Sequence, residues 1–83
     1  MKAPDWLAMR AGGLHPGLDE STWMVTLNGQ PLYRLFAAPA KGRFSCSVTQ
    51  TNNGKRLDGG KDYASVEAAL EGGLVELRAT LGW

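Results

Sequence analysis

The chain has 83 residues, of which 43% are apolar and 20% are charged, a mixture typical of one small globular domain. Its formal net charge of +1 points to no partner of strongly opposite charge, and its single cysteine, Cys46, excludes an internal disulfide. No apolar run reaches about 18 residues and no secretory pattern marks the N-terminus, so we expect a cytoplasmic protein that does not enter a membrane.

The first residues of the chain predict an N-terminal arm. Asp5 is suited to cap a short helix over residues 6–11, and Gly12-Gly13 would end that helix. His15-Pro16-Gly17 is typical of a turn. We therefore assign residues 1–21 to a loosely docked arm with a short helix, and residues 22–83 to a single domain.

From residue 22 the pattern becomes that of strands joined by turns. Thr22 to Leu27 alternates between its two faces, and Asn28-Gly29 is a strong signal for a two-residue hairpin turn. Pro31 lacks a backbone donor and suits the start of the next strand. We expect strands over 22–27, 32–37 and 43–50, turns at 38–42 and 52–54, a short edge strand over 55–57 and a loop over 58–62.

A helix is predicted over residues 66–81. Ser65 is a suitable N-cap, Gly82 suits the C-terminal cap, and leucines recur along one stripe between them. Gly72-Gly73 allows two interpretations, a close approach of the helix to the sheet or a kink that divides the helix. The expected fold is α+β, with a three- to four-stranded antiparallel meander packed against this one C-terminal helix.

Alternation along the strands separates two faces of the predicted sheet. The more apolar face is expected to pack on the helix and carries Trp23, Val25, Leu27, Tyr33, Leu35, Ala37, Phe44, Cys46 and Val48. The outer face would carry Thr22, Met24, Thr26, Leu32, Arg34, Phe36, Arg43, Ser45, Ser47 and Thr49. Its apolar patch at Leu32, Phe36 and Met24 is either covered by the arm, through Trp6 and Leu7, or is a contact surface.

Charged residues are divided between the sheet and the helix. No acidic residue lies between Arg34 and Leu57, whereas Glu67, Glu71 and Glu76 lie on the predicted helix, with Asp58 and Asp62 beside it. A basic sheet face with an exposed aromatic ring suits docking to another protein, where charge steers the encounter. It equally suits nucleic acid, where cations meet phosphates and the ring stacks on a base.

The sequence offers no catalytic set. His15 and Cys46 are the only histidine and cysteine, and they are far apart in the sequence. A metal site needs several such ligands together, and a nucleophile needs a base beside it. We therefore expect a non-enzymatic protein with no catalytic residues, no metal, no cofactor and no small-molecule substrate.

Short motifs in the second half of the chain follow a hairpin-then-helix order. They are Arg43-Phe44, Asn53-Gly54, Tyr63-Ala64-Ser65, Ala68-Ala69 and Gly72-Gly73-Leu74. This pattern resembles that of YegP-like domains. The resemblance implies a hairpin packed against a helix, and it implies no particular biochemical role.

Together these features favour a small protein-binding module, a regulator or inhibitor of the kind encoded by a phage or other mobile element. Its partner would be another protein or a second copy of the chain. The alternative is a nucleic-acid-binding protein that uses the same basic, aromatic face. The predicted partner-binding residues are Arg34, Phe36, Arg43, Met24, Lys41, Lys55, Arg56, Trp6 and Trp83.

Overall fold

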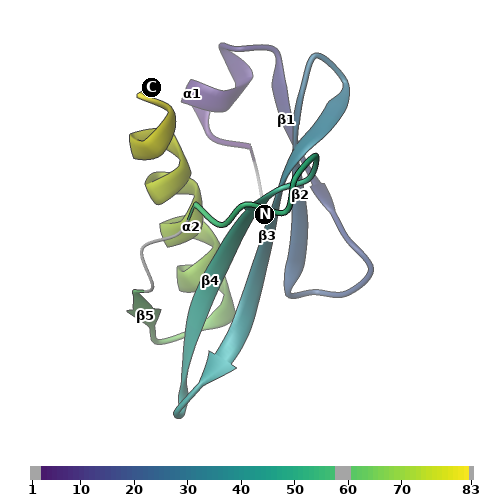
Figure 1. Cartoon of the computed structure of the whole chain (residues 1–83). Coiled ribbons are helices and arrows are strands. Elements are labelled where there is room, and N and C mark those ends of the chain that lie inside the picture. The colour runs from purple at the N-terminus through teal and green to yellow at the C-terminus, as the bar shows by residue number, and fades with distance from the viewer. Residues whose placement is uncertain (1–2, 58–60, 83) are drawn as a thin grey trace.

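The computed structural model describes residues 3–57 and 61–82 as an antiparallel sheet with a long helix on one face (Figure 1). The sheet has five strands in the order β1-β2-β3-β4-β5, so it is a meander. This confirms the α+β prediction, with more strands than expected. In chain order the elements are α1 (Asp5–Ala8), β1 (Gly12–Pro16), β2 (Thr22–Leu27), β3 (Gln30–Ala40), β4 (Arg43–Gln50), β5 (Asp62–Tyr63) and α2 (Val66–Leu81).

The N-terminal segment is part of the sheet and of the core, not a loosely docked arm. β1 pairs with β2 over its whole length, from Gly12 opposite Leu27 to Pro16 opposite Trp23. Leu7 on α1 is 0% exposed and lies in the main core cluster. The helix is shorter than predicted, and Pro4 rather than Asp5 occupies its N-cap. Described residues on both sides of position 22 thus share one sheet and one core.

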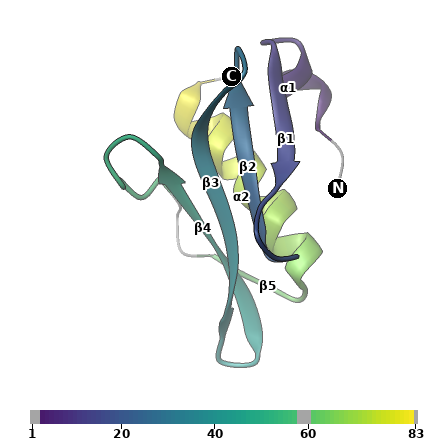
Figure 2. The ribbon, with the colours of Figure 1, turned by 90° about the vertical axis from the view of Figure 1, so that its right-hand side faces the viewer.

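The hairpin between β3 and β4 is longer than predicted. Lys41 and Gly42 form a two-residue turn with positive φ of 50° and 80°, as Asn28 and Gly29 do in the preceding hairpin. The predicted five-residue turn at 38–42 is therefore wrong. Pro39 can lie in β3 because the pairing of β2 with β3 ends at Phe36. No residue of β2 therefore needs a backbone N–H from position 39. The hairpin projects beyond the rest of the molecule (Figure 2).

The last edge of the sheet differs from the prediction. Instead of a strand over 55–57, a single bridge joins Thr49 to Arg56. The strand at this edge is β5, which pairs with Phe44 and Ser45 at the other end of β4. The predicted loop over 58–62 lies partly outside the described residues.

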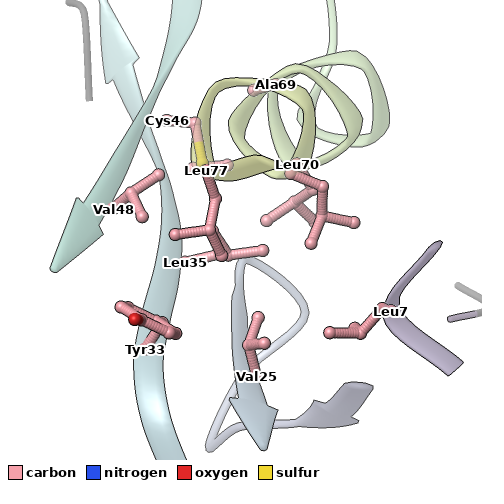
Figure 3. Close-up of a cluster of buried hydrophobic side chains, with 11 residues drawn as sticks. Leu7, Val25, Tyr33, Leu35, Cys46, Val48, Ala69, Leu70 and Leu77 are labelled. Atoms are coloured by element: carbon pink, nitrogen blue, oxygen red, sulfur yellow. The ribbon is translucent and has the colours of Figure 1, made fainter. Parts of the chain in front are cut away.

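α2 closes the inner face of the sheet as predicted. The Ser65 hydroxyl accepts a hydrogen bond from the Ala68 amide at 3.1 Å, and Gly82 ends the helix with φ of 76°. Figure 3 shows Leu70 and Leu77 of the helix pointing toward Leu35 of the sheet. The predicted inner face is confirmed: Val25, Tyr33, Leu35, Ala37, Cys46 and Val48 are buried, and Trp23, Leu27 and Phe44 pack at their margin.

The glycine pair in α2 marks a close approach of the helix to the sheet, and the helix continues through it. A Cβ at position 73 would lie 3.1 Å from the Cβ of Cys46 and 3.4 Å from Cγ2 of Val48, and closer still to the Cys46 sulfur. A Cβ at position 72 would meet the ring of Tyr63. Gly73 therefore sets the distance between α2 and β4.

We expect Gly73→Ala to lower the free energy of unfolding by about 1–3 kcal/mol. Alanine is the better helix former by about 1 kcal/mol, but the overlap with Cys46 outweighs that gain. In a Cys46→Ala background the sulfur is gone, so the cost of Gly73→Ala should fall by about 1 kcal/mol. Urea unfolding of the double-mutant cycle measures this, with Glu71→Ala as the neutral helix control. Equal costs in both backgrounds would rule out the proposed contact.

Candidate binding face

The outer face is the side of the sheet opposite α2, and strand register fixes which residues share it. Residues that pair across antiparallel strands lie on the same face. One row therefore runs His15, Met24, Arg34, Thr49 and a second runs Thr22, Phe36, Ser47. Beside them Ala38 and Ser45 form a third row that continues to Asp62 on β5.

Among residues 3–57 and 61–82, no helix packs on the outer face (Figure 2). The short helix α1 lies on the same side as α2, since Leu7 belongs to the inner core. Trp6 also packs against that core, and the Arg78 guanidinium of α2 lies 6.0 Å from the centre of its ring. The expectation that Trp6 and Leu7 cover Phe36 is therefore wrong, and Trp6 does not extend the outer face.

The centre of the outer face is a pair of side chains on β3. The Arg34 guanidinium lies 5.7 Å from the centre of the Phe36 ring, within the range of a cation–π contact. Arg34 is exposed and Phe36 is half-buried. Met24 pairs with Arg34 from β2 and is half-buried as well. A cation, an aromatic ring and a thioether thus lie together on an open surface.

Two residues predicted for the outer face are not part of its open surface. Thr22 is buried at 6% exposure, and its hydroxyl donates to the Asp19 carboxylate at 3.1 Å. Leu32 packs against the core, because the β2–β3 register shifts between Val25 and Thr26 and leaves Leu32 as an extra residue. The apolar part of the outer face is therefore smaller than predicted, and it rests on Phe36 and Met24.

The predicted basic residues form two separate groups. Lys41 and Arg43 are exposed at the tip of the β3–β4 hairpin. Lys55 and Arg56 are exposed alongside the other end of β4, where Arg56 bridges to Thr49 and so continues the row that contains Arg34. Arg34 and the hairpin tip are about 20 Å apart along β3, at roughly 3.3 Å per residue. Asp62 pairs with Ser45 and therefore also belongs to the outer rows. Trp83 lies outside the described residues.

His15 is a residue of this face that the sequence prediction missed. It lies on β1 opposite Met24 and is exposed. Its imidazole lies next to Gly13. A Cβ added to Gly13 would be 3.0 Å from Nε2 of His15 and 3.0 Å from Oγ1 of Thr26. No local signal could have placed it, because Gly-Gly-Leu-His-Pro has the composition of a turn.

The described residues offer little for catalysis. His15 is on the outer face and Cys46 is buried on the inner face, so they do not meet. No cluster of three metal-ligating side chains was found over 3–57 and 61–82.

On the helix side, a hollow of about 220 Å³ is lined by Trp6, Met9, Arg10 and Arg78. Burial, then the charge of Glu76, raises the pKa of the Tyr63 hydroxyl above its ordinary value.

Comparison with known proteins gave no relatives: family models, curated proteins and solved structures all lack a significant match to this chain. The resemblance to YegP-like domains therefore stays a prediction. In the part of the chain that the structure describes, no helix has the length and apolar character that crossing a membrane requires.

Proposed function

We propose that this chain is a non-enzymatic binding module whose outer face docks on an acidic surface of a partner protein. The observation that carries the proposal is the open Arg34–Phe36 pair, on a face that neither α1 nor α2 covers. Arginine and aromatic side chains supply much of the binding energy in protein interfaces. Met24 lies beside them and would complete the central contact.

The charges favour an acidic partner. Arg34 lies at the centre of the face, and Lys41, Arg43, Lys55 and Arg56 are exposed at its two ends. A partner with acidic groups at matching positions would be steered toward the face and held in one orientation. The small size of the module and its lack of an evident catalytic set suit a regulator or inhibitor carried by a mobile element. The likeness to such proteins is one of size and plan alone.

Nucleic acid is the second candidate for the same face. The observation that favours it is the arrangement of cations on both sides of an aromatic ring, which suits phosphates and a stacked base. Against it, Asp62 lies on the outer face, and Asp19 and Glu20 are exposed in the loop that follows β1. These acids would repel a long polyanion more than a protein patch of limited extent.

Capture from an extract of the source cells, with immobilised wild-type protein and outer-face variants, tests the proposal. A captured protein whose recovery depends on Arg34 and Phe36 supports it. Recovery that disappears after nuclease treatment indicates the second candidate, as does oligonucleotide binding that weakens steeply with added salt.

A further inference from the structure

The free edge of β1 has its own pattern of backbone groups. β1 is the first strand of the sheet, and within residues 3–57 and 61–82 it pairs only with β2 (Figure 2). The Gly17 amide donates to Thr22 at 2.8 Å and the Asn28 amide donates to Ala11 at 3.1 Å, which fixes the hydrogen-bonding alternation between these ends. Gly13 and His15 therefore direct their backbone groups to β2, whereas Gly12 and Leu14 direct theirs away from the sheet.

We infer that this edge pairs with the same edge of a second copy of the chain, antiparallel and about a two-fold axis at Leu14. Leu14 of each copy would exchange both backbone hydrogen bonds with Leu14 of the other. The Gly12 amide would donate to the Pro16 carbonyl across the axis, and Pro16 would contribute no donor. This register pairs the whole of β1, and it joins the two five-stranded sheets into one.

Side chains along the edge permit this approach. From Ala11 to Leu18 the chain carries no Asp, Glu, Lys or Arg, so like charges do not oppose each other along the paired strands. His15 of one copy would lie opposite Gly13 of the other, where no side chain competes for its space. An edge strand that meets a partner in this way no longer presents open backbone groups to solvent.

The residues on either side of β1 are complementary between the two copies, both in apolar character and in charge. Met9 and Leu18 are 85% and 105% exposed, and they belong to the small set of large apolar side chains that the described chain leaves in water. With Leu14 on the axis, the turn that precedes β1 in one copy faces the loop that follows β1 in the other. Met9 and Arg10 would then lie beside Leu18 and the acidic pair Asp19-Glu20 of the second copy, which brings apolar groups together and opposite charges together.

The pairing is short, so we expect a weak dimer that forms in the micromolar to millimolar range rather than a permanent one. Analytical ultracentrifugation of the full chain over that range measures its dissociation constant. A wild-type chain that stays monomeric up to about 1 mM overturns the inference.

Leu14→Pro and Leu14→Ala form a matched pair for this test. Both remove the leucine side chain, but only proline removes the outward amide, and an edge strand tolerates proline at such a position. We expect the dissociation constant of Leu14→Pro to exceed that of Leu14→Ala by at least about tenfold, the loss expected for two hydrogen bonds. Equal dissociation constants for Leu14→Pro and Leu14→Ala would contradict the proposed pairing.

A second pair of variants keeps the test decisive if Leu14→Pro does not fold. Leu18→Arg adds a cation to the loop that faces the Arg10 turn of the other copy, and it should raise the dissociation constant by about tenfold or more. Val75→Arg makes the same change on exposed α2, away from β1, and should leave it unchanged. Equal effects of the two variants also overturn the inference. Arg34→Glu on the outer face should leave dimerisation intact, so this inference and the proposed function fail separately.

Discussion

Replacing Leu7 with alanine is expected to lower the free energy of unfolding by about 2–5 kcal/mol. Leu7 is 0% exposed, and Figure 3 shows it beside Val25 within the core. The truncation leaves a cavity where α1 meets the sheet, and the backbone at Gly12 sits directly against Leu7. Because a small domain is stable by only about 5–15 kcal/mol, this loss is a large share of the total. Urea unfolding followed by tryptophan fluorescence measures it.

Met9→Ala is the matched control for Leu7→Ala. It truncates a neighbouring side chain that is 85% exposed, and its effect should stay within about 0.5 kcal/mol. The two changes together separate a docked N-terminal segment from a loose one. If Leu7→Ala cost no more than Met9→Ala, the segment before β1 would not belong to the core.

Changing Arg34 to glutamate or Phe36 to alanine is expected to weaken partner binding by at least about 30-fold. The first change reverses the charge at the centre of the outer face, and the second removes the ring that the guanidinium contacts at 5.7 Å. Both side chains lie on the face away from the core, so the fold should be retained. Recovery of the captured protein on immobilised variants, followed by a titration of the purified pair, measures the effect.

Val75 provides controls of matched chemistry on the opposite side of the molecule. Val75 is 65% exposed on α2, so Val75→Ala removes an apolar side chain there and Val75→Glu adds a negative charge. Neither should reduce partner binding. Thermal unfolding checks that every variant is folded. Undiminished binding by both outer-face variants, or equal losses in the Val75 controls, would reject the outer face as the contact surface.

Local signals were sufficient for a large part of the fold. The strand over 43–50, the Asn28-Gly29 turn and the helix over 66–81 were each predicted at their observed bounds. The reason is that alternation, turn residues and helix caps act within a few residues of one another. Period-two alternation also placed Arg34 and Phe36 together on the face away from α2.

Features that depend on distant pairing were missed. β1 has two glycines and a proline in five residues, so its strand structure comes from pairing with β2 and not from its own propensity. Because that strand was missed, His15 was missed as a residue of the outer face. Leu32 was assigned to the wrong face, because one extra residue in β3 shifts the alternation there. None of these effects is visible in a short window of sequence.

The alkylation rate of a thiol at position 47 tests the open outer face most directly, because it requires no partner. Ser47 pairs with Phe36 at the centre of the face, and Ser47→Cys in a Cys46→Ala background places a thiol there. The natural Cys46, 2% exposed on the inner face of the same strand, is the reference in the wild-type chain. With an uncovered outer face, the thiol at position 47 should react under native conditions at least about tenfold faster than Cys46. If it reacted as slowly as Cys46, the outer face would be covered and could not be the contact surface.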